Sequence, residues 1–206
     1  MSIFFDFVHS QFTALGRPRS GGLRSLARRA PNASRETTPS ADPIDLAMMR
    51  RCIANSKETA RNEFPFAALV CRDNQILAES GNRVVQDCDV SQHAEIIALS
   101  LAQRVSSSRR LRDCTLYTNV EPCPMCSFAI RETGIARVVY AIRSPVMGGH
   151  SRWSILGDDG LSRIMPVYFA PPPKVIANFC AAEAEDVWNE RHPIMWKLIK
   201  ARGLLG

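Results

Sequence analysis

The 206-residue sequence contains no run of 18 apolar residues, so we expect no membrane-spanning helix. Its seven cysteines are an odd number and are scattered along the chain, which argues against a secreted disulfide framework and favours a reducing compartment. Charged residues make up only 22% of the chain and hydrophobic residues 46%, which argues against a mostly disordered protein. The length fits one domain with an extension, and we find no internal repeat.

Acidic residues are scarce in the first 40 positions, which carry six Arg but only Asp6 and Glu36. The net charge is therefore +4 for residues 1–40 and only +2 for residues 41–206. A leader rich in Arg and Ser and poor in acids is typical of an organelle transit peptide, with a disordered tail or a mis-assigned start as the alternative. We therefore expect one domain over residues 41–206, in the cytoplasm, or in an organelle if the leader is a transit peptide.

Predicted helices and strands alternate along residues 41–206, which indicates an α/β fold with a mixed sheet. Asp42 before Pro43 is a helix-start signal, and Asp73-Asn74 between two apolar runs predicts a hairpin. We expect 145–173 to be irregular. The remaining predictions are helices over 43–60, 94–102, 123–133 and a last one through 188, and strands over 66–72, 75–79, 115–118, 137–142 and 174–177.

Two short motifs stand out, His93-Ala94-Glu95 and Pro122-Cys123-Pro124-Met125-Cys126. Each is weak alone, because a His-x-Glu is usually a polar helix start and a Cys-x-x-Cys can be two packing residues. Together they form the H-x-E…P-C-x-x-C signature of zinc nucleobase deaminases. Both motifs open a predicted helix, which is the context that this signature requires.

The chemistry of a metal site explains these residue types. Cys123 and Cys126 share one face of a helical turn, and the helix start stabilises thiolates, the form that binds metal. His93 is the third predicted ligand. Three protein ligands leave the fourth tetrahedral position for water, which is the arrangement of a catalytic zinc. We therefore predict one Zn²⁺ per chain.

Glu95 is an acid in an otherwise apolar stretch, which is costly unless the carboxylate is used or paired. Beside a metal-activated water it can transfer protons as a general acid and base. Its alternative role is a first-turn acid that complements the helix dipole. The rival to catalysis is a closed structural zinc site with Cys88 or Cys114 as fourth ligand, and the other cysteines are expected to be reduced core residues.

Beyond these motifs, the sequence resembles the cytidine deaminase-like superfamily, in particular its guanine deaminases and tRNA adenosine deaminases. The resemblance lies in residues 66–70, 81–83, 115–123 and 89–95, the last of which departs at three places from Asp-Pro-Thr-Ala-His-Ala-Glu. It implies a three-layer fold with a five-stranded mixed sheet flanked by helices, and a homodimer. It also implies that Asn82 hydrogen-bonds the target base.

The nearly neutral residues 41–206 are a poor partner for a phosphate backbone, which favours a small, guanine-like free base over tRNA. The apolar stretch 193–199 favours it too. A tRNA adenosine deaminase or its subunit, and a non-catalytic zinc domain, are the alternatives.

We expect Phe66 or Trp153 to stack on the base, with Phe179 and Trp196 also available. The further candidates are the backbone N–H groups of Ala94 and Cys123 for the tetrahedral adduct, His150, Asp158 and Asp159 for exocyclic groups, and Glu121 to hold the loop before Pro122.

Overall fold

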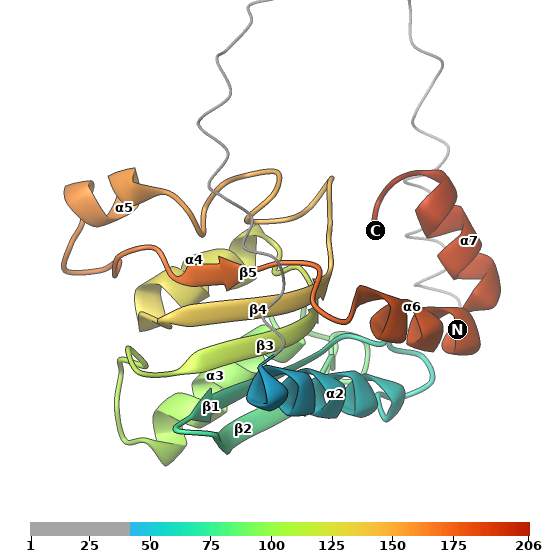
Figure 1. The fold of residues 1–206 in the computed structure, drawn as a ribbon, viewed down its shortest axis with the longest axis horizontal. Coiled ribbons are helices and arrows are strands. Elements are labelled where there is room, and N and C mark those ends of the chain that lie inside the picture. Colours follow the sequence, from blue (N-terminus) through green and yellow to red (C-terminus); the bar gives the residue numbers. More distant parts are fainter. Residues whose placement is uncertain (1–41) are drawn as a thin grey trace, which may run out of the picture. The chain divides into compact units, whose positions relative to one another are not determined.

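The structure, a computed structural model, describes residues 42–206, so the expected leader over residues 1–40 lies outside the described residues. Eleven helices and strands follow one another in this part of the chain (Figure 1). In chain order they are α2 (Pro43–Lys57), β1 (Ala67–Arg72), β2 (Gln75–Gly81), α3 (Ala94–Val105), β3 (Thr115–Val120), α4 (Pro124–Thr133), β4 (Arg137–Ile142), α5 (Asp159–Ile164), β5 (Lys174–Ile176), α6 (Ala181–Arg191) and α7 (Pro193–Ala201).

The five strands form one mixed sheet in the order β2-β1-β3-β4-β5. β1 is antiparallel to β2 and to β3, whereas β3, β4 and β5 are parallel to one another. The parallel strands are joined through helices, as parallel neighbours require. The predicted α/β class and the five-stranded mixed sheet are confirmed.

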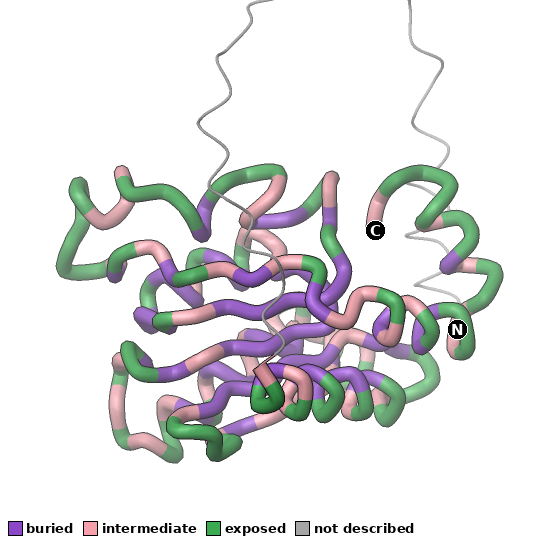
Figure 2. Tube along the Cα trace, viewed as in Figure 1, coloured by how far each residue is buried: buried purple, intermediate pink, exposed green. Residues whose placement is uncertain are grey.

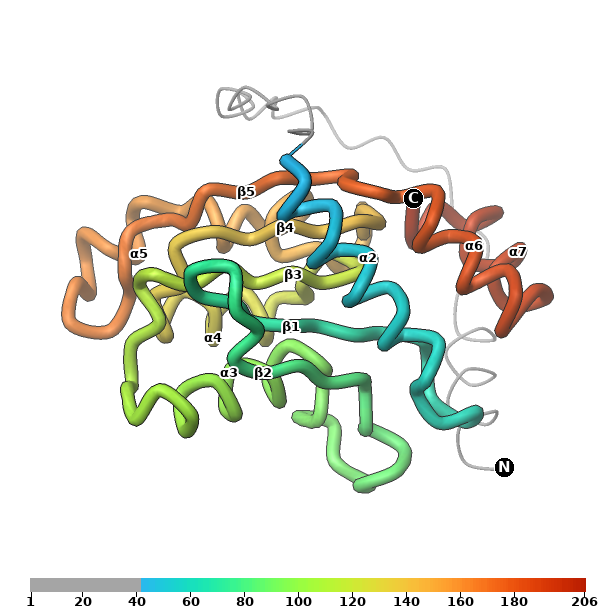
Figure 3. The backbone as a smooth tube through the Cα atoms, turned by 60° about the horizontal axis from the view of Figure 1, so that its bottom comes forward, coloured from blue at the N-terminus to red at the C-terminus, as the bar shows by residue number. Residues whose placement is uncertain are grey.

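Alternate residues of the central strands enter two separate apolar cores, one on each face of the sheet. Leu69 of β1 and Tyr117 of β3 pack with α2 and α6, whereas their neighbours Val70 and Leu116 pack with α3 and α4. The central strands are accordingly buried along most of their length (Figure 2). Figure 3 shows α2 lying across the strands on one side. The predicted three-layer arrangement is confirmed.

Local signals in the sequence set several of these bounds. The Asp42 side chain accepts a hydrogen bond from the backbone N–H of Ile44 and so caps α2. Asp73 and Asn74 adopt positive φ angles of 47° and 65° in the tight turn between β1 and β2, which confirms the hairpin. Gly134, with φ of 77°, ends α4 in the left-handed conformation.

Two helices were not predicted from the sequence. α5 is a single short helix within the segment expected to be irregular, and it has no buried residue. α7 begins at Pro193 directly after α6, and Trp196 on it stacks against Trp188 with ring centroids 5.6 Å apart. Among residues 42–206, no helix is long and apolar enough to cross a membrane.

Candidate metal centre

The two motifs meet at one end of the strands. β3 ends there, and Cys123 follows it as the N-cap of α4. The segment between β2 and α3 reaches the same region, and it ends at His93, the N-cap of α3. This segment is closed by a 3.0 Å hydrogen bond from the backbone N–H of Arg83 to the carbonyl oxygen of Gln92. The starts of α3 and α4 therefore lie side by side.

His93, Cys123 and Cys126 place their ligand atoms in a compact triangle. The two Sγ atoms are 3.6 Å apart, and Nδ1 of His93 is 3.6 Å from Sγ of Cys123 and 3.5 Å from Sγ of Cys126. In a tetrahedral zinc site with Zn–S bonds of about 2.3 Å and Zn–N bonds of about 2.0–2.1 Å, ligand atoms lie about 3.6–3.8 Å from one another. The triangle therefore fits three corners of a zinc tetrahedron.

The two thiols differ in their acidity. Hydrogen bonds with Cys126 and with His93 lower the pKa of Cys123 to about 4, against the opposing effect of burial. The pKa of Cys126 is raised by its hydrogen bond with Cys123, by burial and by the charge of Glu95. The pair therefore retains one proton between its two sulfurs, which a metal ion must displace to bind both as thiolates.

No fourth ligand completes this group within residues 42–206. The cluster of potential ligand atoms within 4.8 Å of one another contains His93, Cys123 and Cys126 only. Cys114 lies before the start of β3, at the end of the strand away from Cys123. Cys88 is exposed, which corrects the expectation that it is a core residue. The closed site with either of these cysteines is therefore not formed.

Glu95 lies in the first turn of α3, two residues after His93, and only 7% of it is exposed. Burial and then the negative charge of Cys123 raise the pKa of its carboxyl group to about 7. Such a carboxyl group gains and loses protons near neutral pH, which is what a general acid and base needs. Glu95 is therefore buried, and its role in proton transfer stays a prediction.

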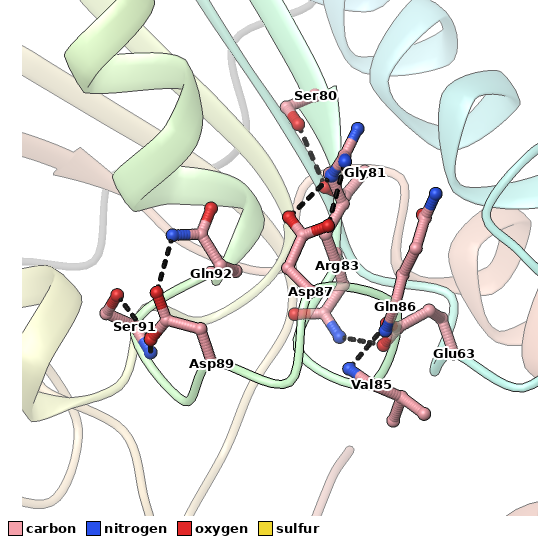
Figure 4. Close-up of polar contacts among 11 residues, drawn as sticks. Glu63, Ser80, Gly81, Arg83, Val85, Gln86, Asp87, Asp89, Ser91 and Gln92 are labelled. Carbon is pink, nitrogen blue, oxygen red and sulfur yellow. Dashed lines mark hydrogen bonds and ion pairs between the residues drawn. The ribbon is translucent and has the colours of Figure 1, made fainter.

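The segment between β2 and α3 is held by carboxylates (Figure 4). Asp89 accepts hydrogen bonds from the backbone N–H and hydroxyl of Ser91 and from the side-chain amide of Gln92. The guanidinium of Arg83 forms a two-bond ion pair with Asp87. These contacts fix the path of the chain into His93.

Glu63 is a residue that the sequence analysis missed. It is 1% exposed, and its Oε2 accepts a 2.6 Å hydrogen bond from Nδ2 of Asn82. Its Oε1 accepts hydrogen bonds from the backbone N–H groups of Val85 and Gln86, at 2.6 and 2.8 Å (Figure 4). The one sequence signal is an acid directly before the apolar residues that lead into β1, Phe64-Pro65-Phe66.

Glu121 holds a different segment from the one expected. Its carboxylate accepts hydrogen bonds from the backbone N–H groups of Ser144, His150 and Ser151, and from the hydroxyl of Ser151. The side chain therefore organises residues 144–151, which follow β4, rather than the loop before Pro122. This brings the start of the irregular segment next to the start of α4.

The predicted stacking residues have different surroundings. Phe66 is half-buried, and its ring contacts Trp188 edge-on with centroids 5.3 Å apart. Trp153 is 56% exposed, with the Arg152 guanidinium 5.5 Å from its ring centroid. Phe179 and Trp196 are buried in the core on the α2 and α6 face.

Two further candidates have structural contacts. A ring nitrogen of His150 lies 3.1 Å from the hydroxyl of Tyr140. Asp158 caps α5 through the backbone N–H of Gly160. Substrate contact by these side chains, by Asp159, and by Phe66 and Trp153 stays a prediction.

A family model described as "Cytidine and deoxycytidylate deaminase zinc-binding region" matches residues 43–142, which include both motifs. The chain is 31% identical over 112 residues to a tRNA-specific adenosine deaminase of Streptococcus pyogenes, covering 54% of this chain and 70% of that protein. It is 43% identical over 77 residues to a guanine deaminase of Bacillus subtilis, covering 37% and 49%. Over other curated relatives, the chain spans between 10% and 60% of their length.

The fold is also similar to that of solved structures. One comes from studies of A-to-I editing by tRNA deaminases at the wobble position of transfer RNA, with a TM-score of 0.61 and 27% identity, covering 69% of this chain and 99% of that one. Another is a mutant of NE0047 in complex with 8-azaguanine, with a TM-score of 0.59 and 28% identity, covering 70% and 82%.

Proposed function

The chain belongs to the cytidine and deoxycytidylate deaminase zinc-binding family, and from this premise we propose that it deaminates a free, guanine-like purine base. The reaction consumes one water, replaces the exocyclic amino group by a carbonyl oxygen and releases ammonia. The observation that carries the proposal is a buried carboxyl group, Glu95, beside a three-ligand metal site that lacks a fourth protein ligand among residues 42–206.

His93, Cys123 and Cys126 would hold a zinc ion, whose chemistry would be to lower the pKa of a water molecule. Glu95 would accept a proton from the attacking water and deliver protons to the ring nitrogen and then to the departing amino group. The backbone N–H of Ala94, in the first turn of α3, has no acceptor within the helix and is available to the developing oxyanion. Asn82 orients the ring through its side-chain amide.

The substrate class rests on charge. Residues 41–206 carry a net charge of only +2, which gives little attraction for the phosphates of a tRNA. The second candidate is tRNA adenosine deamination, which is favoured by the tRNA-editing relatives. A non-catalytic zinc domain is disfavoured because it leaves the buried Glu95 without a role.

We propose that the protein acts as a homodimer. Met125 and Phe128 of α4 are 39% and 43% exposed, and the Phe128 ring contacts Phe169 at a centroid distance of 6.0 Å. Val167 and Tyr168 beside it are exposed as well. A second copy of the chain would cover these apolar side chains. Phe128→Glu should shift the sedimentation coefficient to that of a monomer.

Ammonia release from guanine, adenine, cytosine and tRNA tests the proposed function with the zinc-loaded protein. We expect release from guanine, and a loss of about 10²–10⁴-fold in Glu95→Gln with zinc content unchanged. Release from tRNA alone would establish the second candidate. Full activity in Glu95→Gln would contradict deamination through this carboxylate. So would a zinc-loaded protein that releases no ammonia from any of the four substrates.

A further inference from the structure

The hydrogen bonds of Glu63 determine which way the Asn82 amide faces. A carboxylate only accepts hydrogen bonds, and Oε1 of Glu63 already receives two backbone N–H donors. The group that faces Oε2 at 2.6 Å must therefore be a donor, which only the Nδ2 end of the Asn82 amide provides. The orientation of this amide follows from chemistry, and its Oδ1 is the end turned away from Glu63.

Oδ1 of Asn82 accepts no hydrogen bond from any residue in 42–206, although the residue is only 7% exposed. This oxygen is not among the fully buried polar atoms of the described residues that lack a partner, so water or a ligand can reach it and supply the donor. Asn82 also begins the segment that ends at the metal ligand His93, and the two ends are joined by the Arg83–Gln92 backbone hydrogen bond. The chain that carries this acceptor is thus tied to the segment that leads into the metal ligand His93.

We infer that Glu63 is a positioning residue that presents Asn82 to the substrate as a hydrogen-bond acceptor, so that the site selects a base with a ring N–H donor. The inference rests on the proposed function and deepens it. Guanine has two such donors, one on its six-membered ring and one on its imidazole ring. A base whose facing ring nitrogen is a bare acceptor would meet Oδ1 with like polarity and bind poorly.

Glu63→Gln inverts the polarity of this contact while keeping the size of the side chain. The introduced glutamine can still accept from the N–H groups of Val85 and Gln86 through its oxygen, but its amide nitrogen then faces Nδ2 of Asn82. The Asn82 amide must rotate to relieve two opposed donors, which turns Nδ2 towards the substrate. We expect KM for guanine to rise by roughly 10- to 100-fold, with a smaller change in kcat and unchanged zinc content.

A second substitution restores the acceptor. In the double variant Glu63→Gln with Asn82→Asp, the introduced glutamine amide donates to one oxygen of the introduced aspartate, and the other carboxylate oxygen faces the substrate. The KM of this double variant for guanine should return most of the way to the wild-type value. Asn82→Asp alone sets two carboxylates against each other and should be the worst of the three.

The matched control is Glu79→Gln. Oε2 of Glu79 accepts a 2.8 Å hydrogen bond from Nδ2 of Asn55, so the same acid-to-amide change occurs beside an asparagine of α2, outside the segment that leads to His93. Guanine kinetics should not change in this variant. In the wild type, whichever of 1-methylguanine and 9-methylguanine lacks the ring N–H that faces Oδ1 should bind at least tenfold worse than guanine, and this difference should shrink in Glu63→Gln.

The side-chain amide protons of Asn82 provide a readout that does not depend on turnover. In the zinc-loaded wild type, one of them should be shifted downfield and protected from exchange, and Glu63→Gln should abolish this signature in NMR spectra. An unchanged KM and an unchanged amide signal in Glu63→Gln would overturn the inference while leaving guanine deamination intact. A wild type that releases no ammonia from guanine would overturn the proposed function and the substrate claim, whereas the amide signal would still decide the positioning of Asn82.

Discussion

The buried guanidinium of Arg131 donates two hydrogen bonds to the carbonyl oxygen of Ala170, from Nε at 3.3 Å and from Nη2 at 3.0 Å. It also donates to the carbonyl oxygens of Ile155 and Asp158 and to the hydroxyl of Ser162. These acceptors span residues 155–170, which contain only the short helix α5. One side chain on α4 therefore organises a segment that has little hydrogen-bonded structure of its own.

Arg131→Lys should destabilise this segment, because a lysine ammonium cannot reproduce the fork of donors. We expect a loss of about 3 kcal/mol in the free energy of unfolding measured in urea, with new protease cleavage within residues 155–170. Arg109→Lys is the control, since Arg109 is exposed and its ion pair is with the exposed Glu132. If the two variants lost the same free energy of unfolding and showed the same cleavage, the Arg131 hydrogen bonds would not stabilise this segment.

Gly148→Ala should disrupt the segment that Glu121 holds. A Cβ atom at this position would overlap the Glu121 carboxylate, which already accepts four hydrogen bonds from residues 144–151. We expect a loss of about 1–3 kcal/mol in stability, measured by thermal unfolding. Gly157→Ala places its Cβ 4.0 Å from the nearest atom and should be silent. An unchanged stability in Gly148→Ala would mean that the Glu121 carboxylate can move aside without loss.

A buried ion pair makes stability depend on pH in a defined window. Burial acts to raise the pKa of Asp45, but hydrogen bonds from Arg137 and Tyr117 outweigh it, so that the pKa is lowered. A carboxylate with a lowered pKa contributes fully above its unfolded pKa of about 3.9, and the contribution is lost as pH falls through the folded pKa.

Asp45→Asn should therefore cost about 3 kcal/mol between pH 5 and 8, with the difference from wild type shrinking below about pH 4. Urea unfolding at a series of pH values measures this. Glu190→Gln, which removes an exposed pair with Lys57, should change little at any pH. A difference for Asp45→Asn that stays constant down to about pH 2 would contradict the assigned role.

The two predicted stacking residues can be separated by their burial. Trp153→Ala should raise KM for guanine about tenfold with little change in Tm, because the indole is 56% exposed and stacking is worth about 1–3 kcal/mol. Phe66→Ala should lower Tm by several degrees, because its ring packs against Trp188 and Phe64. An unchanged KM in Trp153→Ala would remove that residue from the substrate contacts.

Removal of zinc should destabilise the fold as well as abolish activity. We expect a chelator to lower Tm by about 10 °C or more, because the ion binds only the folded arrangement of its ligands. Cys126→Ala should have a low Tm that the chelator no longer changes. Differential scanning calorimetry with and without added zinc measures both, and an unaltered wild-type Tm would contradict metal binding at this triangle.

The metal ligands and most of the fold were predictable because their signals are local. Cys123 and Cys126 lie within one helical turn, and each central strand is a short apolar run between turn residues. The role of Glu63 was not predictable, because its partners lie 19 to 23 residues later and meet it only through the folding of β1 against β2. α7 was missed since its only buried residue, Trp196, depends on a tertiary contact with Trp188.

The spacing of the ligands along the chain gives the metal a second role, that of a cross-link. His93 lies 30 residues before Cys123, and the chain between them contains all of α3 and β3. A zinc ion bound at both ends closes this length of chain into a loop, as a disulfide would, in a protein whose seven cysteines form no disulfide among the described residues. Because the three ligands come together only where α3 and α4 are docked on the sheet, loss of the ion should release the whole 93–126 region together.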